Sequence, residues 1–334
     1  MKISFVVVAL NAEHVLPSLL KDLEAQTYPH DQIEVLLVDS VSTDGTLSVM
    51  KSFASDSDMH VQVLSNPRKW LASGCNIALN AAHGKAVIRL DAHAHIPPDF
   101  LANSVQALDG KDVVGGTVLS SHPKTAKEAI FRALDTSRFC GGAASFRNTG
   151  KAQYVDALAY ELARTEVFEK TGPYDERLQR TEDNDMHYRM QQVGYRLYYD
   201  PSIISWHNAR DSLKGQLSQK WGNGVWIGRT LYIQPKCFAP RHLIPLAFTL
   251  VFLLFLFLVP VSQIPLGILF LVYLIFDLFF ATKAAQEAPV GKLPVFLLTP
   301  FLFPLIHFSY GLGTLYGLLT PIKGDKHALD PRPD

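Results

Sequence analysis

The sequence predicts an α/β domain with a mainly parallel sheet, followed by a helical membrane region. In residues 1–235, β-rich apolar runs alternate with segments of helical spacing, a pattern typical of a parallel sheet covered by helices on both faces. Nearly all of the charge also lies in this part, whereas Leu243 to Phe276 contains no charged residue. We therefore expect an α/β domain at 1–235, a transmembrane region at 236–322 and a short polar tail at 323–334.

The first region divides into short elements. Its expected strands are runs rich in apolar and β-branched residues, at Ile3–Leu10, Ile33–Val38, Val61–Leu64, 86–90, Val113–Leu119, Tyr154–Leu158 and Tyr195–Tyr199. Its expected helices lie at 15–23, Thr46–Phe53, Leu71–Ala82 and Glu182–Gln192. Gly194 follows the last helix as a C-cap would, and Pro201 follows the last strand.

Three uncharged stretches follow, at about 243–262, 264–282 and 293–322. A helix needs roughly 20 apolar residues to cross a bilayer, so each stretch is a candidate span. Buried core helices are the alternative interpretation. The third stretch contains Pro294, Pro300 and Pro304, so it either spans the bilayer or re-enters it as a hairpin.

The distribution of basic residues predicts the orientation of these spans. Four of them precede the first span: Lys220, Arg229, Lys236 and Arg241. By the positive-inside rule they place the first domain in the cytoplasm of a multi-pass protein of the cell membrane. The basic residues of the tail also favour the cytoplasm, which three full spans would not allow: Lys323, Lys326 and Arg332.

Composition excludes some partners and compartments. The chain has 31 basic and 31 acidic residues, so its zero net charge gives no indication of a nucleic-acid partner. Its three cysteines, Cys75, Cys140 and Cys237, are isolated and lack metal-type spacing. Reduced thiols in a cytoplasmic domain are the expected state.

Polar residues follow three of the predicted strands. Asn11, Asp39 and Asp91 each stand where an apolar run ends. Because ligands of such sheets bind at the carboxyl ends of the strands, we expect these residues to form one site. His93 follows Asp91 by two positions, and oxygen and imidazole ligands suit Mg2+ or Mn2+ that bridges phosphates. A nucleotide diphosphate with a divalent cation is the predicted ligand.

The order of these motifs resembles that of the family 2 glycosyltransferases. The second strand ends in Asp39 and a Ser-Thr-Asp-Gly-Thr turn, Asp91-Ala92-His93 occupies the family's Asp-x-Asp position, and Glu182-Asp183 its Glu-Asp motif. Ser4–Glu13 resembles the opening strand, with Ala9 in place of the usual proline. Together with Lys220–Gly224 and the membrane segment, the set is similar to bacterial exopolysaccharide enzymes of the succinoglycan glucosyltransferase type. The resemblance implies a GT-A fold, inverting transfer and a lipid-linked acceptor.

The Glu-Asp pair is the predicted catalytic centre. Inverting transfer needs a base that takes the proton of the acceptor hydroxyl, and a carboxylate within hydrogen-bond reach can do this. Asp183 is the expected base, with Glu182 as its neighbour or as an acceptor ligand. Repulsion between adjacent carboxylates raises the pKa of one of them. The alternative is that Glu182, Asp183 and Asp185 merely form the acidic first turn of a helix.

The remaining candidate residues are expected to bind the nucleotide sugar or the metal ion. The nucleotide-sugar contacts expected from the resemblance and from position are Ala9, Asn11, Glu13, Asp39, Arg68, Lys69 and Asp91. Asp39 would accept a hydrogen bond from the base, whereas Arg68 and Lys69 either face base or phosphate or are solvated surface charges.

The predicted metal ligands are Asp91, His93 and His207, with His95 as an alternative to His93. A histidine in place of the family's second aspartate favours Mn2+ over Mg2+.

Lys220 and Trp221 are the predicted acceptor residues. They lie where processive members of the family carry a Gln-x-x-Arg-Trp motif, which is absent here, so transfer of one sugar per encounter is expected. Trp221 either stacks on an acceptor sugar or anchors a helix at the membrane interface.

The leading hypothesis is an inverting, metal-dependent hexosyltransferase that transfers a sugar from a UDP-linked donor to a polyprenyl-linked glycan in exopolysaccharide or cell-surface glycan biosynthesis. A polyprenyl-phosphate sugar synthase is the alternative within the same class. A catalytically silent membrane scaffold that binds glycans is the alternative from another class.

Overall fold

The computed structural model describes residues 1–140, 150–207 and 210–322, and the expected polar tail at 323–334 lies outside them. The described residues form two compact units: one comprises 1–119 and 150–207, and the other 120–140 and 210–322. The expected domain boundary at residue 235 differs from this division, because residues 120–140 and 210–235 belong with the apolar helices.

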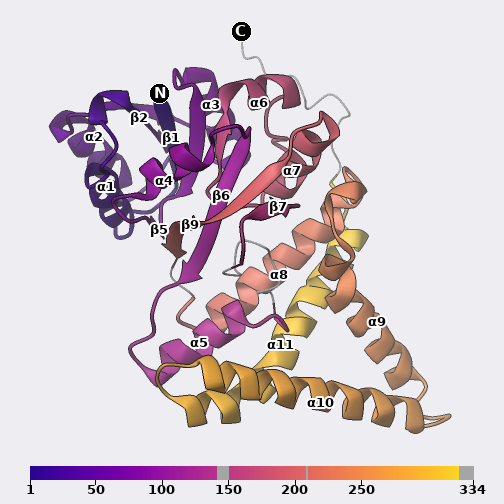
Figure 1. The fold of residues 1–334 in the computed structure, drawn as a ribbon. Coiled ribbons are helices and arrows are strands. Elements are labelled where there is room, and N and C mark those ends of the chain that lie inside the picture. Colours follow the sequence, from indigo (N-terminus) through magenta and orange to yellow (C-terminus); the bar gives the residue numbers. More distant parts are fainter. Residues whose placement is uncertain (141–149, 208–209, 323–334) are drawn as a thin grey trace. The chain divides into compact units, whose positions relative to one another are not determined.

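The first unit is built on one mixed sheet (Figure 1). Its described strands are β1 (Ile3–Ala9), β2 (Ile33–Asp39), β3 (His60–Ser65), β4 (Ala86–Asp91), β5 (Ala94–His95), β6 (Val113–Ser120), β7 (Gln153–Val155), β8 (Leu162–Arg164) and β9 (Leu197–His207). The order is β3-β2-β1-β4-β8-β6-β9-β5, with β7 also paired to β9. The first four strands of this order are parallel, and the pairs of β8 with β4 and β6 are antiparallel.

Helices cover both faces of this sheet, as the alternating pattern predicted. The helices of the first unit are α1 (Leu16–Glu24), α2 (Thr46–Asp56), α3 (Leu71–Ala81), α4 (Phe100–Ala107), α6 (Thr165–Thr171) and α7 (Glu182–Gln192), with a 3-10 turn at His30–Gln32. On β1, Phe5 and Val7 pack with α1, α2 and α4, whereas Val6 faces the side that α3 covers. The α/β prediction is confirmed.

Strands β8 and β9 differ from the expected pattern. Strand β9 runs from Leu197 to His207, although we expected it to end before Pro201. Proline has no backbone N–H, so Pro201 cannot donate a hydrogen bond to a neighbouring strand. The strand nevertheless continues, and the Asp200 carboxylate accepts hydrogen bonds from the Ser202 amide and hydroxyl. Strand β8 was not expected, because a strand of three residues is too short to show the alternation of apolar and polar residues by which strands are recognised.

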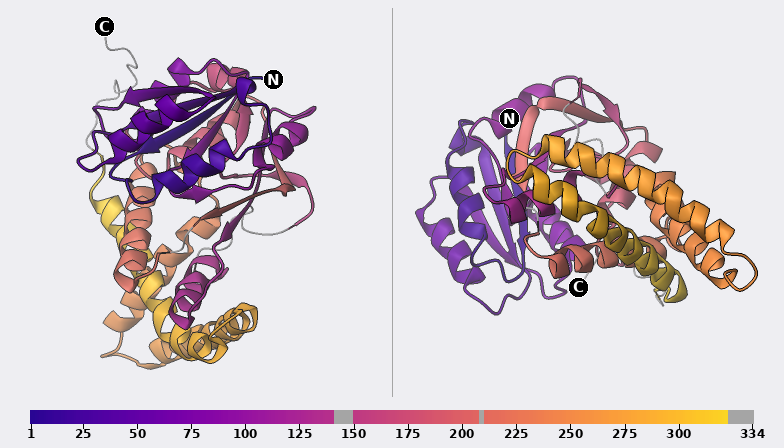
Figure 2. Two further views of the ribbon diagram at one scale, coloured as in Figure 1. Left: turned by 90° about the vertical axis from the view of Figure 1, so that its left-hand side faces the viewer. Right: turned by 90° about the horizontal axis from the view of Figure 1, so that it is seen from below.

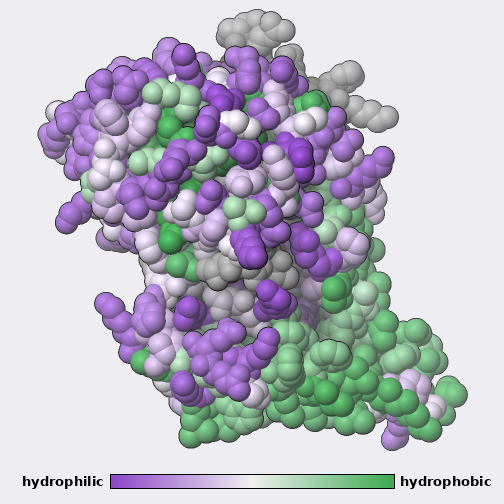
Figure 3. All heavy atoms as spheres, viewed as in Figure 1, coloured by the Kyte–Doolittle hydropathy of each residue, from purple (hydrophilic) through white to green (hydrophobic). Residues whose placement is uncertain are grey.

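The second unit contains the apolar helices. Its elements are α5 (Ala126–Thr136), α8 (Leu213–Thr230), 3-10 turns at Pro235–Cys237 and Pro240–Leu243, α9 (Ile244–Phe257), α10 (Ile264–Glu287) and α11 (Lys292–Leu319). Three helical segments are long and apolar enough to cross a membrane: Pro240–Phe257, Ile264–Glu287 and Lys292–Leu319. Helices α10 and α11 lie side by side (Figure 2), and exposed apolar side chains gather over α9 and α10 (Figure 3).

The third apolar segment forms one continuous helix. Pro300 and Pro304 lie inside α11, where each removes one backbone donor without dividing the helix. The hairpin alternative for this segment is therefore wrong.

Helices α8 and α11 approach each other through glycines. An added Cβ would lie 2.3 Å from the Thr314 carbonyl oxygen at Gly228, and 2.1 Å from the Val225 carbonyl oxygen at Gly317. Such distances leave no room for a side chain. Gly224, in the Lys220–Gly224 segment, packs in the same way, since an added Cβ there would lie 2.2 Å from the Tyr310 carbonyl oxygen.

Replacing Gly228 with valine is expected to destabilise the second unit by about 2–3 kcal/mol, because the helices must separate to admit the side chain. The measurement is the thermal unfolding midpoint in detergent. Gly267→Val is the matched control, since nothing lies within 4 Å of a Cβ at Gly267. Equal midpoints for the two variants would show that this close contact is not required.

Candidate active site

Hydrogen bonds join the loops after β1 and β2 into one surface at the carboxyl edge of the sheet. Asn11 accepts a hydrogen bond from the Thr43 amide at 2.8 Å, and Glu13 accepts one from the Gly45 amide at 3.0 Å. Ala9 pairs with Asp39 in the parallel ladder. The structure thus brings together Ala9, Asn11, Glu13 and Asp39, of which Asn11 and Asp39 were predicted to lie together from the strand ends.

Asp39 is buried within this surface. Its carboxylate accepts from the Ser42 amide at 3.2 Å, which fixes the turn that follows β2. The carboxylates of Asp39 and Glu13 both accept hydrogen bonds from backbone amides of the loop after β2. These two residues therefore shape the surface as well as line it.

Arg68 and Lys69 follow β3 on the same edge. Arg68 forms an ion pair with Glu176, which also accepts from the Asn76 amide group at 3.0 Å. Lys69 has a positive φ of 67° and is exposed. Arg68 is therefore held by a carboxylate, which the interpretation as a solvated charge did not anticipate.

Asp91 ends β4, the strand on the other side of β1. Val8 pairs with Val38 on one side and with Asp91 on the other, so Asp39 and Asp91 end strands that flank β1. The Tyr160 hydroxyl donates to Asp91 Oδ2 at 3.2 Å. Tyr160 is buried and has a φ of 54°, a left-handed conformation that is costly for an aromatic residue.

The two predicted histidine ligands lie on adjoining backbone. His93 immediately precedes β5, and β5 pairs with β9 so that Ala94 stands opposite His207. One carboxylate with imidazoles is a donor set that suits Mn2+ better than Mg2+. Within residues 1–140, 150–207 and 210–322, however, no three His, Cys, Asp or Glu side chains are grouped as a metal site. The structure therefore does not bring the predicted ligands Asp91, His93 and His207 together as a metal site, and a cation at the end of β4 would need ligands from the diphosphate as well.

His95 does not belong to this group. Its Nδ1 lies 3.1 Å from Asp22 Oδ2 and 3.5 Å from Ser18 Oγ, both on α1. The strand alternation from Asp91, on which the alternative of His95 as a metal ligand was based, is interrupted by the turn at Ala92 and His93.

Glu182 and Asp183 open α7 and differ sharply in environment. Glu182 is 4% exposed, and its Oε1 lies 3.2 Å from Arg89 Nη1. Burial and the neighbouring Asp183 raise the pKa of Glu182 to about 7, although Arg89 opposes the shift. Asp183 is partly exposed and accepts from the Asn184 amide at 2.8 Å. Of the two carboxylates, Asp183 is the one that an acceptor can reach.

The charged residues behind this pair were not predicted. Arg89 on β4 is partly buried and forms an ion pair with Glu182, and Glu161 and His187 form a second pair, at 3.4 Å, that is fully buried. A basic residue inside an apolar strand, two positions before Asp91, was a signal that pointed to Arg89. His187 stands four residues after Asp183, so helical spacing placed the two on one face. Glu161 carried no such signal.

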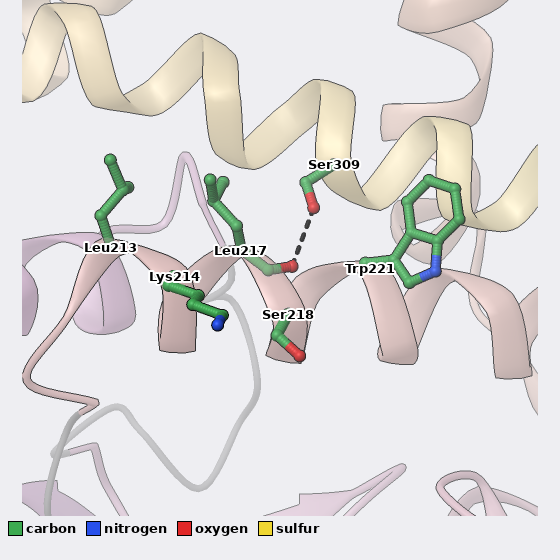
Figure 4. Close-up of a pocket in the computed structure, with 6 residues that line it drawn as sticks. All are labelled: Leu213, Lys214, Leu217, Ser218, Trp221 and Ser309. Carbon is green, nitrogen blue, oxygen red and sulfur yellow. Dashed lines mark hydrogen bonds between the residues drawn. The ribbon is translucent and has the colours of Figure 1, made fainter.

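The predicted acceptor residues belong to the second unit. Lys220 is 7% exposed, whereas Trp221 is 41% exposed. Trp221 lines a shallow groove of about 510 Å3 with Lys214, Leu213, Leu217, Ser218 and Ser309 (Figure 4). Ser309 donates to the Leu217 carbonyl at 2.8 Å and so ties α11 to α8 at this groove. Lys214, and not Lys220, is the cation that lines it.

Comparison with known proteins agrees with this architecture. The model of Glycosyl transferase family 2 matches residues 4–172, half of the chain. A relative from Methanococcus voltae is 23% identical and covers 97% of this chain and 98% of its own. It is a dolichyl N-acetyl-α-D-glucosaminyl phosphate 3-β-D-2,3-diacetamido-2,3-dideoxy-β-D-glucuronosyltransferase. Succinoglycan biosynthesis protein ExoA of Rhizobium meliloti is 26% identical over 72% of this chain and 74% of its own.

Solved structures show the same fold. A mannosyltransferase from Pyrobaculum calidifontis, in complex with GDP-Man and Mn2+, has a TM-score of 0.61 and 19% identity, and the match covers 91% of this chain and 87% of that one. Staphylococcus aureus TarS in complex with UDP-GlcNAc has a TM-score of 0.54 and 15% identity, over 97% and 93% of the two chains. The predicted GT-A fold is confirmed, and the chain belongs to glycosyltransferase family 2.

Proposed function

We propose that this glycosyltransferase moves a sugar from a UDP-linked donor to a polyprenyl-diphosphate-linked glycan, with inversion and one sugar per encounter. The observation that carries the proposal is the arrangement of Asp39, Asp91 and the Glu182-Asp183 pair around the end of β4. The Methanococcus voltae relative acts on a dolichyl-phosphate-linked sugar by its name, which supports a lipid-linked acceptor. The named ligand of TarS supports a UDP donor.

The chemistry requires a base and a means of neutralising the leaving diphosphate. The acceptor oxygen bonds to the anomeric carbon, the bond from that carbon to the diphosphate oxygen breaks, and the hydroxyl proton passes to Asp183. Glu182 is the buried neighbour of the base, and because burial raises its pKa to about 7, part of it carries a proton near neutral pH. Asp39 binds the nucleotide base, and Arg68 and Lys69 lie near the same edge for its phosphates.

Asp91, His93 and His207 would hold a divalent cation at the diphosphate. Such a cation supplies charge neutralisation for the leaving group. We favour Mn2+, because imidazole ligands replace a carboxylate here. The complex of the Pyrobaculum calidifontis enzyme with Mn2+ supports this choice.

The helices of the second unit would anchor the enzyme as a multi-pass protein of the cell membrane, with the α/β unit in the cytoplasm. Three apolar helices support the anchor, and the basic residues before α9 support the orientation. Trp221 and Lys214 line a groove of mixed apolar and cationic character on α8, suited to a lipid-linked acceptor.

Direct transfer to polyprenyl phosphate is the second candidate. Lys214 in the α8 groove favours it, since a bare phosphate needs a cation beside the membrane. The two functions differ in the acceptor alone, so one experiment separates them.

The test is a donor and acceptor panel with the purified full chain in detergent. The donors are UDP-glucose, UDP-galactose, UDP-GlcNAc and GDP-mannose, and the acceptors are undecaprenyl phosphate and undecaprenyl-diphosphate-linked GlcNAc, with Mn2+ present. Product mass is expected to increase by one sugar on the diphosphate-linked acceptor with a UDP donor. Transfer to undecaprenyl phosphate alone would favour the second candidate, and turnover only with GDP-mannose would overturn the UDP assignment.

A further inference from the structure

Tyr160 contacts the candidate site but has no part in the reaction described above. Its hydroxyl donates to Asp91 Oδ2 at 3.2 Å. The side chain is 6% exposed and belongs to the apolar core that includes Ile88 and Leu90 of β4. A buried tyrosine usually finds a hydrogen-bond partner for its hydroxyl, and here the partner is the carboxylate that ends β4.

The backbone of Tyr160 has an unfavourable conformation. Its φ of 54° lies in the left-handed region, which is costly for an aromatic residue and persists only where the surrounding structure fixes it. Strand β8 provides one such constraint, because it starts two residues later and pairs with β4, Leu162 opposite Ile88. Continuing this antiparallel register by two residues places Tyr160 opposite Leu90, directly beside Asp91.

The next side chain along the chain provides a second constraint. Glu161 is 6% exposed, and its Oε1 lies 3.4 Å from Nε2 of His187 on α7, which is 2% exposed. The segment that carries Tyr160 is thus attached to β4 on one side and to α7 on the other. Its conformation is therefore fixed independently of the hydroxyl, and the hydroxyl is held in place for Asp91.

The two carboxylate oxygens of Asp91 differ in their surroundings. Oδ2 accepts from Tyr160, whereas Oδ1 makes no hydrogen bond with any residue that the structure describes. Asp91 is partly exposed, so Oδ1 can meet a ligand from solution. A hydrogen bond to one oxygen fixes the rotation of a carboxylate and directs the other oxygen toward its ligand.

We propose that Tyr160 is a positioning residue for Asp91, whose carboxylate its hydroxyl fixes so that Oδ1 is presented to the cation at the donor diphosphate. The inference rests on the proposed role of Asp91 as a ligand of that cation. Hydrogen-bond partners of a metal-binding side chain contribute to the affinity of its site, and loss of one typically weakens binding by about 10–100-fold.

The experiment is calorimetric titration of the purified full chain in detergent with UDP, or with GDP if the panel gives turnover only with GDP-mannose, in Mn2+ or in EDTA. Tyr160→Phe removes the hydroxyl and keeps the ring that packs in the core. The affinity should weaken by about tenfold in Mn2+ and by less than about twofold in EDTA. The unfolding midpoint should fall by only a few degrees, because one hydrogen bond is lost.

A double-mutant cycle tests whether Tyr160 acts through Asp91. In the Asp91→Ala background, Tyr160→Phe should leave the affinity in Mn2+ unchanged, because the carboxylate that the hydroxyl orients is absent. A tenfold loss that persisted in this background would show that Tyr160 acts independently of Asp91, and the proposal would be wrong.

The matched control is Tyr199→Phe. Tyr199 lies on β9 of the same sheet and is 1% exposed, and its hydroxyl lies 2.6 Å from Thr117 Oγ1 on β6. This variant also loses a buried tyrosine hydroxyl, but its nucleotide affinity should equal that of the wild type in both conditions.

Two results would overturn the proposal and leave Tyr160 a structural residue: equal affinities of Tyr160→Phe and Tyr199→Phe in Mn2+, or equal weakening of Tyr160→Phe in Mn2+ and in EDTA. Failure of the proposed function gives a different result. If Mn2+ had no effect on nucleotide binding by the wild type, the proposed cation site would be wrong, and the inference with it.

Discussion

Replacing Asp183 with asparagine is expected to reduce turnover by about a thousandfold while changing the affinity for UDP by less than about twofold. The amide has almost the same shape as the carboxylate but cannot take the acceptor proton. Asp183 is partly exposed and its neighbour Glu182 is buried against Arg89, so no second carboxylate of the pair is placed to replace it. The measurements are kcat with the donor and acceptor of the panel and calorimetric titration with UDP.

Asp109→Asn is the control for this variant, because Asp109 is an exposed aspartate in the loop after α4 and contacts no residue of the candidate site. Its turnover should equal that of the wild type. Near-normal turnover of Asp183→Asn would remove Asp183 as the base and direct attention to Glu182, whose raised pKa suits proton transfer near neutral pH.

Replacing Asp91 with alanine is expected to abolish the Mn2+-dependent part of UDP binding and to weaken the affinity in Mn2+ by about 10–100-fold. Asp91 is the carboxylate of the predicted ligand set, and imidazoles alone leave the charge of the cation uncompensated. The measurement is calorimetric titration with UDP, with and without Mn2+.

Two further variants help to explain a change in UDP binding by Asp91→Ala. Asp91→Asn keeps an oxygen for the Tyr160 hydroxyl, so it separates loss of the cation from loss of that hydrogen bond. His95→Gln is the control from the neighbouring strand β5, since His95 contacts Asp22 and lies outside the proposed ligand set. Unchanged UDP affinity of Asp91→Ala in Mn2+ would refute the ligand role of Asp91.

Much of the first unit could be predicted from local sequence. Strands β1, β2 and β4 are apolar on both faces, as strands covered by helices on both sides must be, and Asp39 and Asp91 end two of them. The sheet edge that gathers the candidate site followed from this pattern. By contrast, β8 and the full length of β9 depend on pairing with strands far along the chain, and such partners leave no local signal.

The buried charges behind the site could not be predicted in the same way. Glu161 and His187 are polar residues that sequence patterns place at the surface, and only the fold brings them together. The end of the first compact unit differs from the expected boundary for a related reason. Helix α8 is polar enough to resemble a surface helix, but its glycines fit against α11, and this closeness depends on tertiary packing.

The anomeric configuration of the product is the most direct measure of the central claim, that Asp183 deprotonates the acceptor in a single displacement at the end of β4. Proton NMR of the glycan formed from an α-linked UDP-sugar gives this configuration through the coupling constant of the new anomeric proton. The account predicts a β-linked product throughout the time course. An α-linked product would contradict single displacement and the role of Asp183 as base.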